Sequence, residues 1–216
     1  MFKAIVSLQW KSARAWIIVA MLAVAALPFA SVTRTWPTDP DRFAIFLAEL
    51  DLWSVFYPLT AVVVGVTISV LTWRSDRRGD FVYALTLPVA RWRYVLLRFG
   101  ASAVWLGAIA VALWLAAMIA VATVSMPATL SSHPHRLAAK FALALLSVFG
   151  LAFAGAALPQ KVRRGVAWTV VVVLALQFGL SQLGIGEDWL RLVAESLVGP
   201  GGPLAALGGR WMLIDV

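Results

Sequence analysis

The side chains best suited to recognition chemistry lie in one polar stretch between two apolar runs, from Trp73 to Phe99. This stretch reads WRSDRRGDFVYALTLPVARWRYVLLRF. It contains six of the chain's 18 basic residues, which are Arg74, Arg77, Arg78, Arg91, Arg93 and Arg98. Guanidinium groups bind carboxylates and phosphates through charge-assisted hydrogen bonds. The stretch can therefore bind acidic side chains of another protein or the phosphates of lipid headgroups.

The middle of this stretch predicts a short helix. Asp76 and Asp80 can cap such a helix and favour its start, and Gly79 permits a sharp turn out of the preceding apolar run. The apolar face of the helix consists of Phe81, Val82 and Leu85. Pro88 suits a first helical turn, where its missing N–H costs nothing, so the next long helix is expected to begin there. On charge alone, an ordinary positively charged connector explains the stretch equally well.

The rest of the sequence offers few groups for catalysis. His133 and His135 flank a proline and can ligate a metal, but no third ligand stands nearby, so residues 125–136 are expected to form a solvated loop. The chain has no G-x-x-x-x-G-K-[ST] phosphate loop, so it is not expected to hydrolyse ATP. It also lacks cysteine, which excludes disulfides and thiolate metal sites. We predict no catalytic, cofactor-binding or metal-binding residue.

The elements that position these groups are predicted to be membrane-spanning helices. Hydrophobic residues make up 62% of the 216 positions and charged residues 13%, against roughly half and a quarter in globular proteins. About 20 apolar residues cross a hydrocarbon core of about 30 Å. We expect an all-α polytopic membrane protein, with an N-terminal interfacial amphipathic helix and five transmembrane helices. The interfacial helix covers residues 1–15, and the spans cover residues 16–33, 54–73, 97–124, 140–158 and 165–184.

Polar groups inside the predicted spans are few. The third and fourth spans, counted from Phe99 and Phe141, contain no Asp, Glu, Lys, Arg or His side chain. The other three spans contain none either. Since intramembrane charges mark proton relays and embedded catalytic sites, this argues against a proton-coupled carrier and most membrane hydrolases. Four uncharged polar residues can line a substrate path or bond to neighbouring helices. These residues are Thr60, Thr67, Gln177 and Ser181.

The distribution of charge predicts that the N-terminus is cytoplasmic. With that orientation the inner segments carry +10 and the outer segments −2, which together give the formal net charge of +8. Lys3, Lys11 and Arg14 lie on one face of residues 1–15 and can contact lipid phosphates, or they form the positive flank of an ordinary first span. The charge is spread over three inner segments, so we expect no nucleic-acid partner.

Two outer segments are predicted to be amphipathic. Asp41 to Leu52 reads as a short outer helix that leads into the second span. Residues 187–216 form an outer segment whose apolar positions alternate with Arg191 and Glu195, an i,i+4 charge pair. A glycine- and proline-rich block from Gly199 to Pro203 ends that helix.

The polar stretch resembles the first cytoplasmic loop of ABC-2 type transporter permeases. In that family an acidic residue and a glycine precede a short coupling helix, and a leucine-proline-x-x-arginine motif leads into the third span. Asp76, Gly79, Leu87, Pro88 and Arg91 take those places in this chain. Two details depart from the family: Asp80 follows the glycine where a small hydroxyl residue is frequent, and the acidic residue is Asp where Glu is commoner. A sixth span, which the family has, is not present in this sequence.

The resemblance implies a transport subunit rather than an enzyme. It implies a permease that lies in the inner (plasma) membrane, contacts membrane lipid and exports its substrate. A separate cytoplasmic ABC ATPase, which binds ATP and Mg, would dock on loop 75–91, and a second permease copy or a related permease would complete the transporter. The implied ATPase-coupling residues are Asp76, Arg77, Arg78, Gly79, Asp80, Phe81, Leu85, Leu87, Pro88 and Arg91. The alternatives are a non-catalytic structural or assembly subunit of a larger membrane complex, and a membrane enzyme with polar groups converging inside the bundle.

Overall fold

The structure is a computed structural model of the whole chain. It describes residues 2–32, 40–78, 90–123, 131–158, 161–162, 164–165, 196–199, 202, 204–208, 211 and 213–215. Within the second helix it describes the side chains of residues 55–74.

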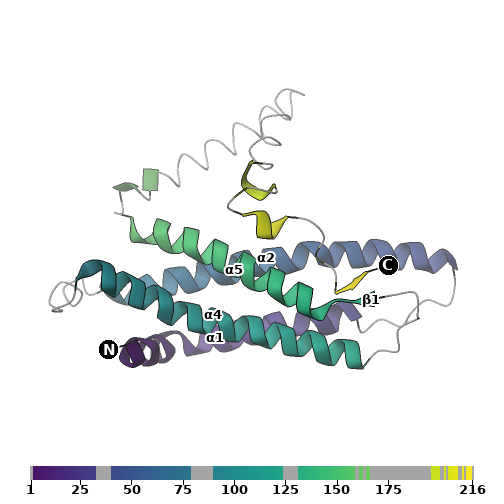
Figure 1. The fold of residues 1–216 in the computed structure, drawn as a ribbon, viewed down its shortest axis with the longest axis horizontal. Helices are drawn as coiled ribbons and strands as arrows, with labels where there is room; N and C mark the ends of the chain where they lie inside the picture. The colour runs from purple at the N-terminus through teal and green to yellow at the C-terminus, as the bar shows by residue number, and fades with distance from the viewer. Residues whose placement is uncertain are drawn as a thin grey trace, which may run out of the picture.

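Four long helices make up most of the described residues (Figure 1). They are α1 (Phe2–Val32), α2 (Pro40–Arg78), α4 (Arg91–Ala122) and α5 (Pro134–Ala157). Each contains a segment long and apolar enough to cross a membrane: Phe2–Ser31, Val55–Arg74, Trp92–Ala122 and Pro134–Ala157. The prediction of long apolar helices is thus confirmed, and each of the first four predicted spans overlaps a segment apolar enough to cross a membrane. The fifth predicted span, 165–184, lies outside the described residues apart from Gly165.

The first two helices are longer than the apolar runs that predicted them. α1 shows no break between the predicted interfacial helix and the first span, because the sequence has neither glycine nor proline between Phe2 and Leu27. Likewise, α2 joins the predicted outer helix at residues 41–52 to the second span and continues to Arg78. The predicted loop at 75–91 therefore begins inside a helix, and α2 ends next to Gly79.

The other two helices also differ from prediction at their starts. α4 begins at Arg91, where the carbonyl of Ala90 accepts hydrogen bonds from the backbone N–H groups of Arg93 (2.9 Å) and Tyr94 (3.2 Å). α5 begins at Pro134, whereas the prediction placed this segment in a solvated loop and began the span at residue 140. Proline at the first helical position has a suitable φ and needs no hydrogen-bond partner, which explains the earlier start.

The helices pack in pairs. α1 lies chiefly along α4 and α2 chiefly along α5, and α4 and α5 also pack on each other. Large apolar side chains fill the centre, including Ile17, Leu106, Leu113, Phe141 and Phe149. The outer surfaces are apolar as well, with side chains such as Leu22 (67% exposed) pointing outward. Apolar side chains both inside and outside are what a bundle surrounded by hydrocarbon requires.

The C-terminal residues fold back onto the end of the bundle where α5 starts. Strand β1 (Ser131–Ser132) pairs antiparallel with β2 (Ile214–Asp215), and the N–H of His133 donates to the carbonyl of Leu213 at 3.0 Å. Trp211, only 1% exposed, donates from Nε1 to the carbonyl of Leu207 in the 3₁₀ helix η1 (Ala205–Leu207) at 3.0 Å. Lys140 Nζ lies 4.8 Å from the centre of the Trp211 ring.

Candidate functional site

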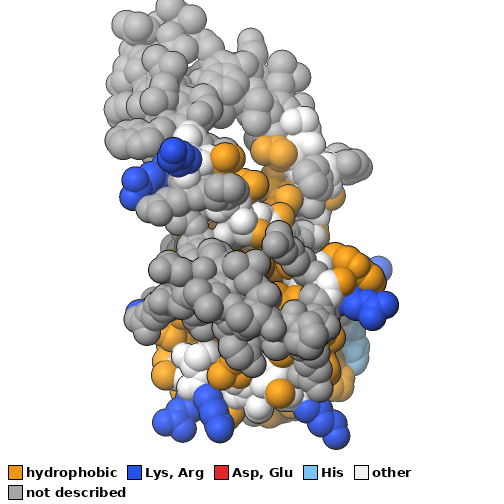
Figure 2. Space-filling view, turned by 90° about the vertical axis from the view of Figure 1, so that its left-hand side faces the viewer, with side chains coloured by type: hydrophobic (Ala, Val, Ile, Leu, Met, Phe, Trp, Pro, Cys, Tyr) orange, Lys and Arg blue, Asp and Glu red, His pale blue; other side chains and the backbone are white. Residues whose placement is uncertain are grey.

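Basic side chains gather at one end of the bundle. The start of α1, the end of α2, the start of α4 and residues 161–162 and 164–165 beyond α5 all lie at this end (Figure 1). Figure 2 looks onto it and shows lysine and arginine side chains at its edges, among scattered hydrophobic side chains. The exposed basic residues of these segments are Lys3, Lys11, Arg14, Arg74, Arg93, Lys161 and Arg164. Four segments of the chain thus form one basic end.

The predicted coupling residues are placed only in part. Asp76, Arg77 and Arg78 form the last turn of α2, and Arg91 is the first residue of α4. Their backbones are helical and frame the connection between the two helices. The other predicted coupling residues lie outside the described residues; they are Gly79, Asp80, Phe81, Leu85, Leu87 and Pro88.

The second turn of α4 contains Arg98, an arginine whose burial the sequence interpretation missed. Arg98 is 3% exposed and donates from Nη1 to the backbone carbonyl of Thr72 on α2. Its guanidinium carbon lies 5.8 Å from the centre of the Trp73 ring and 5.4 Å from that of Tyr94. Aromatic faces and a carbonyl oxygen both stabilise a cation removed from water. Arg98 thereby links α4 to the end of α2.

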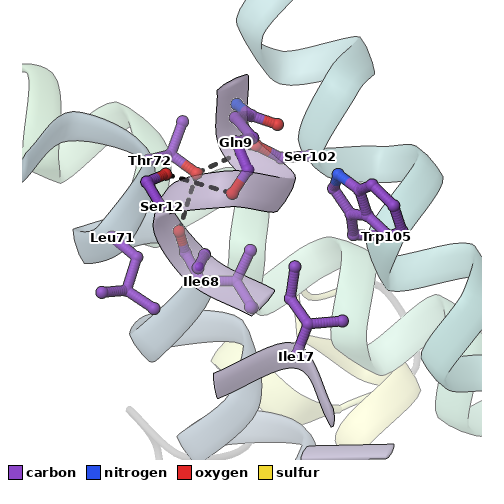
Figure 3. A pocket seen from close by; sticks show the side chains of 9 residues that line it. Gln9, Ser12, Ile17, Ile68, Leu71, Thr72, Ser102 and Trp105 are labelled. Carbon is purple, nitrogen blue, oxygen red and sulfur yellow. Dashed lines mark hydrogen bonds between the residues drawn. The ribbon is translucent and has the colours of Figure 1, made fainter. Parts of the chain in front are cut away.

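Three polar side chains extend this link to α1 (Figure 3). Gln9 Nε2 donates to Ser102 Oγ at 3.2 Å and to the carbonyl of Arg98 at 3.4 Å. The hydroxyls of Ser102 and Thr72 are 2.9 Å apart, and Thr72 Oγ1 also lies 2.7 Å from the carbonyl of Ile68. Since a hydroxyl has one hydrogen, Thr72 donates to Ile68 and Ser102 donates to Thr72. We call Gln9, Thr72, Arg98 and Ser102 the polar clamp.

The polar clamp corrects the prediction that the spans carry no charge. The search for charged side chains counted the third span from Phe99 and thereby left out Arg98, although the predicted bounds 97–124 include it. The segment of α4 that is apolar enough to cross a membrane, Trp92 to Ala122, also includes Arg98. Lys140 likewise belongs to the segment Pro134–Ala157 of α5. The sequence did contain a pattern that could have indicated the burial of Arg98. Tyr94, Arg98 and Ser102 are spaced four residues apart and therefore lie on one face of α4.

The predicted path-lining threonines lie together. Thr60 and Thr67 both line a groove of about 320 Å³ between α1 and α2. Thr60 Oγ1 donates to the carbonyl of Phe56 in its own helix at 2.7 Å. Gln177 and Ser181 lie outside the described residues.

The histidine pair lies at the opposite end of the bundle. His135 Nδ1 accepts a hydrogen bond of 2.9 Å from Trp114 Nε1, which ties the start of α5 to α4. Within the described residues, no group of three or more His, Cys, Asp or Glu side chains could hold a metal ion.

Searches against family models, curated proteins and solved structures found no match for this chain. Function must therefore be inferred from the residues and their arrangement.

Proposed function

We propose that this chain is the permease subunit of an ABC-2 type transporter, in which a separate ATPase drives export by binding the connection between α2 and α4. The observation that carries the proposal is the bond from buried Arg98 to the carbonyl of Thr72. The bond joins α2 and α4 (Arg98 is in α4, Thr72 in α2), the two helices that flank the segment whose sequence resembles a coupling helix.

The connection joins the end of α2 to the start of α4, and both helices are continuous at this point. Thr72 lies six residues before the end of α2 at Arg78, which is about 9 Å along the helix axis. Arg98 lies seven residues after the start of α4 at Arg91, about 10 Å along its axis. A partner that displaces the connection between these ends therefore acts on both helices close to where they are fastened together.

The polar clamp makes α1, α2 and α4 move as one body at this end. Its hydrogen bonds are buried, and breaking them would take the bond to the Thr72 carbonyl from a buried cation and the bond to Thr72 from the Ser102 hydroxyl in an apolar medium. A displacement of the connection is thus passed on as tilting of whole helices, which is a common form of switching motion. The ATPase supplies ATP and Mg, and a second permease copy or a related chain completes the pathway.

Cross-linking tests the partner. Because the chain contains no cysteine, a Phe81→Cys variant carries a single thiol within the predicted coupling helix. Membranes of the native host are treated with a thiol-reactive photo-cross-linker, and the captured proteins are identified by mass spectrometry. We expect an ABC ATPase with a phosphate-loop peptide. Arg136→Cys, which places an exposed thiol at the opposite end, should capture none.

The same experiment separates the alternatives. Capture of only non-ATPase membrane proteins by Phe81→Cys would favour a structural or assembly subunit and refute the proposal. If an ATPase is captured, Arg78→Glu and Gly79→Val should lower ATP-driven transport in vesicles while the chain still inserts. Arg136→Glu makes the same charge change at the other end and should leave transport unaltered.

A further inference from the structure

α1 and α2 are fastened together at two levels and lie apart between them. Toward the basic end the polar clamp joins Gln9 to Thr72 through Ser102. Toward the other end, the hydroxyls of Ser31 and Tyr57 are 3.3 Å apart. Between these levels the two helices leave the groove of about 320 Å³. The groove is therefore framed by two fixed contacts rather than being a loose gap.

The walls of this groove are apolar. α1 contributes Trp16, Val19 and Ala23, and α2 contributes Leu59 and Val63. The only polar residues in the lining are Thr60 and Thr67, and the hydroxyl hydrogen of Thr60 is used within its own helix. A site with such walls selects hydrocarbon and offers little to a charged or strongly polar ligand.

The groove opens sideways toward the lipid. Trp16, Val19, Leu59 and Val63 are exposed, and all lie within the segments of α1 and α2 that are apolar enough to cross a membrane. Hydrocarbon is the medium next to such a surface, and water is absent there. An unfilled groove of this size would deprive its lining of dispersion contacts, so filling it with hydrocarbon is favourable.

The shape favours a flexible chain over a helix. Along α1 the lining extends from Trp16 to Ala23, about 11 Å along the axis. Its volume is at the lower end of the range of about 300–1,000 Å³ for small-molecule sites. A helix, about 10–12 Å wide, can insert only side chains, whereas a hydrocarbon tail can lie along the whole groove.

A small pocket beside the groove indicates where the polar part of the occupant lies. Its lining is mostly apolar and shares Ile68 with the groove, but it also contains the polar side chains of Gln9, Ser12 and Thr72 (Figure 3). Gln9 is 7% exposed, and its Oε1 has no hydrogen-bond partner among the described residues. The pocket holds only about 10 Å³, room for one water that could bridge Gln9 to a headgroup.

We propose that this groove binds one acyl chain of a bilayer phospholipid whose headgroup lies toward the basic end. The site would exist whether or not an ATPase binds the chain, so it goes beyond the proposed function. It assigns α1 and α2 a lipid-binding role in the groove between the polar clamp and the contact of Ser31 with Tyr57.

Photolabelling tests the site. The protein is placed in lipid nanodiscs containing phosphatidylglycerol with a diazirine in the middle of one acyl chain, irradiated, and mapped by mass spectrometry. We expect several-fold more label on residues 16–23 and 59–67 than on the equally lipid-exposed flank of α4 at Val104, Val111 and Leu115.

Matched variants decide between occupants. Ala23→Phe places a ring in the groove and should reduce the label there several-fold. Ala15→Phe, at an exposed position of α1 that does not line the groove, should leave the label unaltered. Labelling no higher than on the α4 flank, or insensitive to Ala23→Phe, would overturn the proposal. Disulfide formation between two copies of Ala23→Cys would show that a second chain covers the groove and would also overturn it.

Discussion

At the residue scale, Arg98 is the side chain whose removal should lower the free energy of unfolding most. Arg98→Gln removes the cation from between Trp73 and Tyr94 and loses the bond to the Thr72 carbonyl. A hydrogen bond from a charged group contributes about 1.5–3 kcal/mol. We expect a loss of that size in the free energy of unfolding, measured by titration with a denaturing detergent.

Two variants check that this loss comes from the buried contacts of Arg98. Lysine keeps the charge but lacks the planar fork that can bond the carbonyl while lying against two rings, so Arg98→Lys should restore only part of the stability. Arg93→Gln, at an exposed position of the same helix, should have little effect. Equal unfolding midpoints for Arg98→Gln and Arg93→Gln would contradict the role assigned to the polar clamp.

Gly65 is the second residue at which a small change should matter. A Cβ atom built there would lie 3.0 Å from Cγ1 of Val148 and 3.2 Å from the backbone nitrogen of Phe149 on α5. Because a backbone atom cannot rotate away, Gly65→Ala should force α2 from α5 and cost about 1–3 kcal/mol. Gly107→Ala meets nothing within 4 Å and should be neutral or slightly stabilising, since alanine favours helix. The same detergent titration compares the two, and equal midpoints would refute the close approach.

At the element scale, hydropathy predicted which parts of the chain form the long apolar helices but not where the helices begin and end. The predicted second span, 54–73, lies within α2, which begins at Pro40. The helix around it continues to Arg78 because arginine and aspartate leave an established helix intact until glycine follows. Hydropathy alone could not reveal the polar clamp or the groove, because both depend on which helices pack together. Local periodicity could not predict the hydrogen bond between Gln9 and Ser102, because these residues are 93 positions apart in the sequence.

The continuity of α2 and α4 on both sides of the connection leads to a prediction about mechanical coupling. Two glycines inserted between Ala90 and Arg91 separate the connection from the start of α4 by a flexible joint. ATPase capture by Phe81→Cys should persist, whereas ATP-driven transport should fall strongly. The same insertion after Thr123, just beyond the opposite end of α4, should leave transport largely intact. If both insertions reduce transport equally, the connection does not act as a lever.

At the scale of the whole molecule, the pairing of β1 with β2 constrains the path of the chain across the membrane. α5 has 24 residues and is about 36 Å long, comparable to a hydrocarbon core of about 30 Å. The chain leaves α5 at Leu158, at the basic end, but Leu213 is hydrogen-bonded to His133 at the other end (Figure 1). Between residues 158 and 211 it must therefore return by the length of α5.

If the bundle spans a bilayer, that return is an odd number of further crossings. The sequence predicts one such crossing at 165–184. Single thiols can test it, since the chain has no cysteine. With the N-terminus inside, Arg136→Cys and Ala205→Cys, both exposed, should react with a membrane-impermeant maleimide added outside intact cells. Lys161→Cys should react only after the membrane is opened. Reaction of Lys161→Cys and Ala205→Cys from the same side would mean an even number of crossings, and the β1–β2 pairing could not hold in the membrane.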